Sequence, residues 1–297
     1  MTKALIKDYI RANIHVDGLH SARIPGVQFF RASEPIPCAP AVYEPSLIAI
    51  VSGSKETVLD GNRYVYDSAK YLCCPMTMPV SAGTPSASAE NPLYGVLVTL
   101  DPRLMTEIAV EMENAGGVAR TMGTGPAAQG VKLADWDDRF TDALTRLVQL
   151  NDCPTDAAVL GEARLRELYY AVLKGEAGGF ARRAFGVGNA IARSIAHVAA
   201  NLNAPMSIDE MADRAHMSRA VFHRKFKQAT SMSPIQFVKS MRLNKAAMKI
   251  AGGMNVNEAA MIVGYISPSQ FSREFKRMYG QSPRQWGYDQ QRAIELV

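Results

Sequence analysis

Between residues 26 and 100, apolar residues are gathered into short runs that are separated by turn signals. The runs SLIAIVSG, KETVL, NRYVYD and YGVLVTL are rich in Val, Ile, Leu and Tyr, most of which favour strands. The segments between them include Asp60-Gly61-Asn62, Ser81–Pro85 and Asn91-Pro92, which are typical of turns. Many short strands at this spacing predict an antiparallel sheet that curls into a barrel or a sandwich.

The hydrophobic period changes at Asp101 from that of strands to that of helices. The segment DPRLMTEIAVEMENAGG predicts a helix that has Pro102 at its first position and ends at glycines. A loop rich in Gly, Thr and Ala follows at residues 116–130, and two further helical segments then run to Gly175. We therefore expect helices at about residues 101–174 to flank the strands.

One of these helices carries an apolar stripe at helical spacing, formed by Phe140, Leu144, Leu147 and Val148. Two interpretations are open. The stripe packs the helix onto its own domain, or it pairs with a second copy of the chain to form a homodimer.

The glycine-rich, basic segment GEAGGFARRAFGVGN predicts a linker at residues 179–189. It separates an N-terminal domain at residues 1–178 from a C-terminal domain at residues 190–297, and 297 residues are enough for two domains with ordinary cores. Beyond the linker the chain reads as a bundle of short helices.

A basic, aromatic phrase occurs twice in the C-terminal domain, as FHRKFKQATSMSP and again 49 residues later as FSREFKRMYGQSP. In each copy two phenylalanines lie four residues apart, which places both on one helix face. Arg224 and Arg273 fall outside that face, and Ser218 and Ser267 stand where helix N-caps are expected. Each copy is therefore predicted to be a short amphipathic helix with a basic exposed side.

A further short helix precedes each copy. The segment SIDEMADRAHMS has Ser207 at an N-cap with Glu210 three residues later, a capping-box arrangement, and NVNEAAMIVGYIS has Gly264 in its turn. Helix, tight turn and basic helix together make a helix-turn-helix unit, which we expect at residues 207–229 and again at 256–279. The second turn carries one extra residue.

Between the two units, SPIQFVKSMRLNKAAMKIAGG has start and stop signals for a connecting helix at about residues 234–251. About 16 helical residues span ~24 Å. Together with the units that it joins, such a helix can hold two basic helices about one DNA turn apart, ~34 Å, for entry into successive major grooves.

The net charge of +5 is unevenly distributed. Residues 181–297 hold 17 Lys and Arg against 7 Asp and Glu, whereas residues 1–180 hold 16 against 21. This asymmetry indicates that the C-terminal domain meets a polyanion, which the paired basic helices identify as double-stranded DNA.

The sequence offers little for an enzyme. Only His15 and His20 occur in the N-terminal half, both ahead of the strands, and there is no zinc spacing, P-loop, GxSxG or dinucleotide fingerprint. We therefore expect no catalytic residues, metal or cofactor. No apolar run reaches the ~20 residues of a membrane-spanning helix. The N-terminal segment MTKALIKDYIRANIH lacks a secretory signal, so a cytoplasmic location is expected.

The adjacent Cys73 and Cys74 stand out in the strand region, since neighbouring side chains on a strand point to opposite faces. They are either two buried apolar residues, or one thiol reacts with an electrophile or oxidant and changes the DNA-binding state. No Lys, Arg or His lies beside them to lower a thiol pKa. Nearby side chains that either line a pocket or serve packing are Tyr43, Glu44, Tyr64, Tyr66 and Met76.

The repeated units and their connecting helix, through about residues 190–286, closely resemble the DNA-binding domain of AraC/XylS-type transcription regulators. Residues 42–102 resemble the N-terminal domain of one AraC-type subgroup, which implies a cupin-like regulatory barrel followed by helices. The expected fold class is thus α+β, with an N-terminal antiparallel β-barrel, flanking helices and an all-α C-terminal domain.

The resemblance also implies which positions read bases: Ala220, His223 and Arg224 in the first unit, and Pro268, Ser269, Gln270 and Arg273 in the second. Arginine can bond guanine bidentately and glutamine suits adenine, although either arginine can instead hold a phosphate or an acidic neighbour. The positions expected near phosphates are Ser218, Lys227, Ser267, Lys276 and Arg277. Many relatives have an arginine where Gly287 follows Trp286 here.

We therefore predict a DNA-binding transcription regulator, controlled by a small-molecule or electrophile signal at its N-terminal domain and acting as a homodimer. Activation through RNA polymerase is what the resemblance implies. The alternatives are a non-specific DNA-binding scaffold and a cupin-type enzyme with a basic helical appendage.

Overall fold

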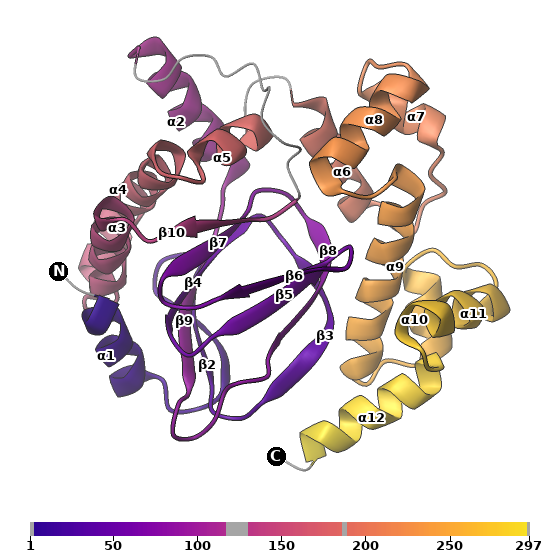
Figure 1. Cartoon of the computed structure of the whole chain (residues 1–297), viewed down its shortest axis with the longest axis horizontal. Helices are drawn as coiled ribbons and strands as arrows, with labels where there is room; N and C mark the ends of the chain where they lie inside the picture. The colour runs from indigo at the N-terminus through magenta and orange to yellow at the C-terminus, as the bar shows by residue number, and fades with distance from the viewer. Residues whose placement is uncertain (1–2, 117–129, 186–188, 296–297) are drawn as a thin grey trace.

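The computed structural model of the chain describes residues 3–116, 130–185 and 189–295 (Figure 1). A β region occupies the middle of the molecule. Helices of the N-terminal half lie on one side of it, and the C-terminal helices lie on the other (Figure 1). The predicted loop at residues 116–130 falls mostly outside the described residues.

Two antiparallel sheets form the β region, with strand orders β1-β2-β9-β4-β7-β10 and β3-β8-β5-β6. The strands are β1 Gly18–Ser21, β2 Val27–Ala32, β3 Ile36–Tyr43, β4 Ser46–Ser52, β5 Lys55–Leu59, β6 Asn62–Tyr66, β7 Lys70–Cys74, β8 Met78–Thr84, β9 Leu93–Thr99 and β10 Lys132–Asp135. The predicted antiparallel architecture is confirmed. Within the described residues, however, the two sheets remain separate ladders, so the barrel is not closed by hydrogen bonds.

Local signals account for most of the strand boundaries. At the Asp60-Gly61 signal, φ is 48° and 78°, so both residues adopt the left-handed conformation that a two-residue hairpin between β5 and β6 requires. The sequence missed β1 and β10, which lie outside residues 26–100. β10 is only four residues long and is formed by pairing with β7, from which about sixty residues separate it in the chain.

Helices make up most of the remaining described residues. Those of the N-terminal half are α1 Lys3–Asn13, α2 Pro102–Asn114, α3 Asp138–Gln149, α4 Pro154–Lys174 and α5 Gly178–Phe185, with the short 3-10 helix η1 Leu150–Asp152 between α3 and α4. Those of the C-terminal half are α6 Ala190–Ala200, α7 Ile208–Arg214, α8 Arg219–Thr230, α9 Pro234–Ala251, α10 Val256–Ile262, α11 Pro268–Tyr279 and α12 Pro283–Glu295.

The apolar stripe of α3 is buried in its own domain. Phe140, Leu144, Leu147 and Val148 are 0–3% exposed, and the Phe140 ring stacks on Tyr71 of β7 with centroids 4.0 Å apart. This corrects the dimer interpretation of the stripe, because side chains that their own chain already covers leave no apolar surface for a second copy.

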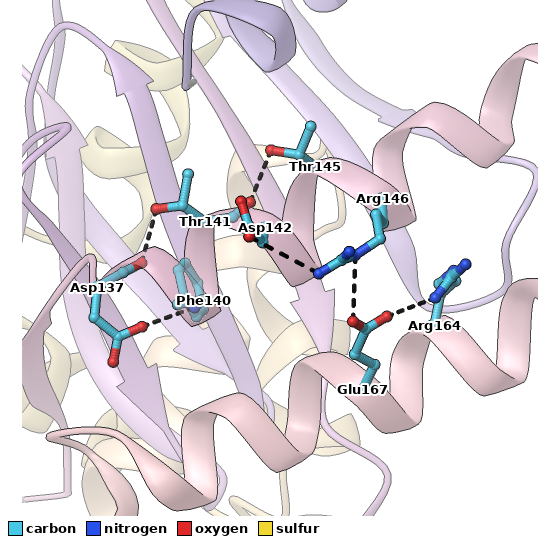
Figure 2. Close-up of polar contacts among 8 residues, drawn as sticks. All are labelled: Asp137, Phe140, Thr141, Asp142, Thr145, Arg146, Arg164 and Glu167. Carbon is cyan, nitrogen blue, oxygen red and sulfur yellow. Dashed lines mark hydrogen bonds and ion pairs between the residues drawn. The ribbon is translucent and has the colours of Figure 1, made fainter. Parts of the chain in front are cut away.

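The polar side of α3 faces α4 (Figure 2). Glu167 of α4 lies between two arginines, with ion pairs of 3.2 Å to Arg146 and 2.8 Å to Arg164. Asp137 caps the helix by accepting a hydrogen bond from the backbone N–H of Phe140 at 2.7 Å. The ion pairs are partly exposed and contribute little stability, so the apolar side of α3 supplies most of the packing energy.

The predicted linker at residues 179–189 is wrong for most of its length. Residues Gly178–Phe185 form α5, which packs on α2 and α4. Phe180, Ala181, Ala184 and Phe185 are all buried, and they recur at the spacing of one helix face. The apolar period therefore outweighs the glycines in this segment, and residues 186–188 of the predicted linker lie outside the described residues.

Candidate nucleic-acid interface

The first helix-turn-helix unit is built as its sequence predicts. Ser207 and Glu210 form the expected capping box at α7, and the hydroxyl of Ser218 caps α8. Phe222 and Phe226 are fully buried, and the Phe226 ring meets Phe237 of α9 edge-on at 5.3 Å. The phenylalanines thus fix which side of α8 faces solvent.

The second unit, α10–turn–α11, follows the same plan. Phe271 and Phe275 are buried, and Ser267 caps α11. Gly264 in the turn has φ 90°, and a Cβ there would come within 2.6 Å of the Leu202 carbonyl oxygen, so the position requires glycine. The residue that this turn has in addition to the first is Ile266, whose side chain is 97% exposed.

The residues expected to read bases are all exposed, as are those expected to contact phosphates. On α8 and in its N-cap these are Ser218, Ala220, His223, Arg224 and Lys227, and on and before α11 they are Ser267, Pro268, Ser269, Gln270, Arg273, Lys276 and Arg277.

Arg224 and Arg273 form no ion pair or hydrogen bond with any residue that the structure describes, whereas the neighbouring Arg219 pairs with Asp209 at 3.3 Å. The two arginines are therefore free to bind a ligand.

A polar network that the sequence analysis missed holds α11 against α9. Glu274 accepts hydrogen bonds from the Tyr265 hydroxyl at 2.7 Å and from Gln270 at 3.4 Å, and it pairs with Lys239 of α9 at 3.1 Å. Burial alone would raise the pKa of Glu274, but the bonds from Tyr265, Lys239 and Gln270 outweigh it and lower the pKa. Glu274 is therefore ionised, and it fixes the orientation of Gln270.

Helix α9 is tied to the end of α6 by two cations. The guanidinium of Arg242 donates to the carbonyl oxygens of Leu202 and Ala204, each at 2.9 Å, and the ammonium of Lys245 lies 3.4 Å from the carbonyl oxygen of Ala199. These carbonyls belong to the C-terminal end of α6 and the loop that follows, where cations are favourable. These bonds fix the position of α9, which joins the two units, relative to α6.

α9 also contacts the N-terminal domain, at β3 and β8. Asn244 of α9 is 2% exposed, and its amide nitrogen donates to the carbonyl oxygens of Ala41 on β3 and Val80 on β8, each at 2.8 Å. Its amide oxygen accepts a hydrogen bond from the hydroxyl of Tyr279, the last residue of α11, at 2.6 Å. The Asn244 side chain thus links β3 and β8 of the N-terminal domain to α11, the second recognition helix.

Cys73 and Cys74 are completely buried and point to opposite faces of the six-stranded sheet, Cys73 toward the helices with Tyr71 and Cys74 toward the facing sheet. Burial raises the pKa of Cys73 to about 12, and it also raises the pKa of Cys74, whose thiol donates to the carbonyl oxygen of Met76 at 3.1 Å. Both thiols are protonated and covered, which favours the packing interpretation over the reactive one.

Two further findings concern the described residues alone. They include no helix that is long and apolar enough to cross a membrane. They also hold no group of three or more His, Cys, Asp or Glu side chains placed to bind a metal ion.

Comparison with known proteins agrees with both halves of the structure. Residues 23–180 match the family described as AraC-type transcriptional regulator N-terminus, and residues 211–288 match a helix-turn-helix domain. The regulator MtrA of Neisseria gonorrhoeae is 41% identical over 81 residues, which is 27% of each chain. The regulator AlkR of Acinetobacter baylyi is 29% identical over 97 residues, or 32% of each chain. This chain thus spans about a third or less of these relatives.

The fold is similar to that of ToxT from Vibrio cholerae over nearly the whole chain. The ToxT structure with bound (E)-4-(8-methylnaphthalen-1-yl)but-3-enoic acid has a TM-score of 0.55 at 12% identity, covering 89% of this chain and 98% of that one. At such low identity the likeness concerns the fold alone. The N-terminal family match extends over more than half of the chain, and the two helix-turn-helix units complete it. The chain therefore belongs to the AraC-type family of transcriptional regulators.

Proposed function

We propose that the protein is a sequence-specific DNA-binding regulator of transcription and not an enzyme. The observation that carries this proposal is the pair of recognition helices, α8 and α11, which are joined by one helix and expose Arg224 and Arg273, neither of them paired with any described residue. The 18 residues of α9 span ~27 Å, which together with the units at its ends suits entry into successive major grooves. The relatives named above, MtrA and AlkR, are also transcriptional regulators.

The contacts divide into two kinds. Arg224 and Arg273 would bond guanine O6 and N7, and Gln270, oriented by Glu274, would read adenine. The remaining base contacts would come from the methyl group of Ala220, the imidazole of His223, the hydroxyl of Ser269 and the ring of Pro268. Phosphate contacts would come from Ser218, Lys227, Ser267, Lys276 and Arg277, and these give affinity and salt dependence without base preference.

Control would come from a small molecule bound by the N-terminal domain. ToxT, whose fold is similar, has been solved with an unsaturated fatty acid bound. A change in the N-terminal sheets would reach α11 through Asn244, because that side chain bonds β3, β8 and Tyr279 together. The proposal includes a cytoplasmic location, a homodimer whose interface lies elsewhere than the stripe of α3, and contact with RNA polymerase.

The test begins with genome-wide mapping of bound sites to obtain a cognate operator. Arg224→Ala and Arg273→Ala should each weaken binding to that operator by about 1–3 kcal/mol, roughly 5- to 150-fold, and relax base choice at one position. Arg284→Ala, which removes an exposed charge on α12, serves as the matched control.

Competition with random duplex DNA separates a regulator from a non-specific scaffold. A regulator should prefer its operator by at least about 10³-fold at physiological salt. If wild-type protein binds random DNA equally well, the regulator proposal fails. If both arginine variants lose affinity equally on operator and random DNA, the base-reading assignment fails.

A further inference from the structure

The turn of the second helix-turn-helix unit contains a large apolar residue that the fold does not use. Ile266 is the residue that this turn has in addition to the first, and its side chain is 97% exposed. The turn closes without it, because the backbone N–H of Tyr265 bonds the carbonyl oxygen of Ala260 at 2.9 Å. In the first unit, the N–H of Met217 makes the corresponding bond to Ala212 at 3.0 Å. Ile266 is therefore an addition to a complete turn, and its side chain is available to a partner outside the chain.

Ile266 belongs to an apolar groove between the two units. The groove has a volume of about 860 Å³, and two more of its side chains are largely exposed, Met261 at 70% and Ile235 at 59%. Met206 and Val238 also line it. Single exposed apolar residues are common on proteins, but a contiguous exposed group of them marks an interaction surface. The groove therefore has the character of a binding surface.

The N-terminal end of α11 shares this groove. Gln270, four residues after Ile266, lines the groove too, and Ser267 between them caps the helix. The first residues of a recognition helix are the ones that approach base edges in the major groove. Whatever binds the start of α11 therefore also covers Ile266, which identifies double-stranded DNA as its partner.

The charges of the groove also suit DNA. Lys239 and Arg242 line it against one acid, Glu274, among the residues that the structure describes there. Glu274 is paired with Lys239 at 3.1 Å, so the described lining offers no unpaired carboxylate that would repel phosphate. An excess of positive charge at an exposed apolar surface favours a polyanion over a neutral protein helix.

The chemistry of base edges then selects the group that Ile266 contacts. The C5-methyl of thymine is the apolar group that base pairs present in the major groove. Glu274 holds one amide hydrogen of Gln270, which leaves the carbonyl oxygen and the second hydrogen of that amide for adenine. Because adenine pairs with thymine, an A·T pair presents matching groups to both side chains in one groove.

We propose that Ile266 is a specificity-determining residue, and that it contacts the C5-methyl of a thymine in the half-site read by α11. This inference rests on the proposed DNA-binding function and deepens it, since it adds an apolar contact to those of Arg273 and Gln270. The first unit has no counterpart of Ile266, so the contact makes the two half-sites unequal.

The test measures binding of the full-length protein to its operator by fluorescence anisotropy, with each thymine replaced in turn by deoxyuridine, which lacks only the methyl group. For wild type, the replacement should weaken binding about fourfold at the thymine that Ile266 contacts, the effect of exposing about one apolar carbon. Ile266→Ala should bind the unmodified operator several-fold more weakly. In that variant the same deoxyuridine should have almost no further effect, because the two changes remove one contact.

Met261→Ala is the matched control, since it removes an exposed apolar side chain from the same groove on α10. It should bind the operator as wild type does and keep the deoxyuridine effect. Thymines that other residues contact should keep their effects in Ile266→Ala. Both substituted side chains are largely exposed, so the variants should fold, and equal urea midpoints check this.

The contact is refuted if no thymine is sensitive in wild type, or if the sensitivity is the same in Ile266→Ala. Equal losses of operator binding in Met261→Ala and Ile266→Ala would assign the effect to the groove as a whole and reject the contact. Normal operator binding by both variants, with lowered transcription, would identify a protein as the partner of the groove and also reject it. Failure of the DNA-binding proposal is distinguishable, because wild type would then show no preference for the operator over random DNA.

Discussion

Asn244→Leu tests whether one buried amide holds the two domains together. Leucine has a similar volume, but it removes the donors to Ala41 and Val80 and the acceptor for Tyr279. Two carbonyl oxygens across the domain contact then lose their donor, Val80 in a buried bond and Ala41 in a partly buried one, and the partly buried Tyr279 hydroxyl loses its acceptor within the C-terminal half. Each polar group left without a partner costs about 1–3 kcal/mol as long as the domains stay docked. When the domains separate, water satisfies all three groups. The docked state should therefore lose about 2 kcal/mol at the lower limit from the two bonds that cross the contact, roughly a 30-fold change in the docking equilibrium.

Hydrogen exchange measured by mass spectrometry reports this opening directly. Exchange should accelerate in β3, whose edge α9 covers, and in α9 itself, while β9 in the middle of the other sheet should keep its protection. Tyr279→Phe removes one of the three bonds and should have a smaller effect, about 1 kcal/mol. Asn257→Leu, at an exposed position of α10, is the control and should leave exchange unchanged. Wild-type exchange in β3 and α9 of Asn244→Leu would refute the reasoning.

Two further predictions concern a turn and the buried thiols. Gly264→Ala should lower the free energy of unfolding by at least about 1 kcal/mol in urea titrations, because φ is 90° and the added methyl meets the Leu202 carbonyl. Gly252→Ala, where φ is −77° and the added methyl makes only ordinary contacts, should change it far less, and equal effects would contradict this account of the turn. In native protein at pH 8, a thiol reagent should modify the exposed Cys38 first, although partial burial and the neighbouring Glu56 raise its pKa, and leave Cys73 and Cys74 unmodified until urea is added. Rapid native modification of either buried cysteine would restore the reactive interpretation.

The C-terminal domain was predictable from sequence because its signals are local. A serine that caps a helix, a glutamate three residues later and two phenylalanines four apart act within one or two turns of chain. The predicted units at residues 207–229 and 256–279 and the connecting helix at 234–251 therefore agree closely with α7–α11. The same logic placed α2 at Asp101 and the hairpin at Asp60-Gly61.

Where the sequence was misread, two signals competed or a partner was unknown. Glycines around residue 178 suggested a linker, but the apolar spacing of Phe180 and Phe185 with the alanines between them produced α5. The stripe of α3 showed correctly that one helix face is buried. An amphipathic pattern does not say what covers that face, and here the chain's own β7 packs on it through Tyr71.

By itself, the sequence determined the two recognition helices, their spacing, their basic exposed faces and the strand character of the N-terminal half. Only the tertiary structure decided that Asn244 bonds to Ala41, 203 residues earlier in the chain, and that Tyr71 of β7 stacks on Phe140 of α3. The physical reason is that capping and helix periodicity act over a few residues. Partners across a domain contact or between a helix and a sheet depend instead on how the whole chain packs, and an isolated asparagine or tyrosine carries no record of what it will face.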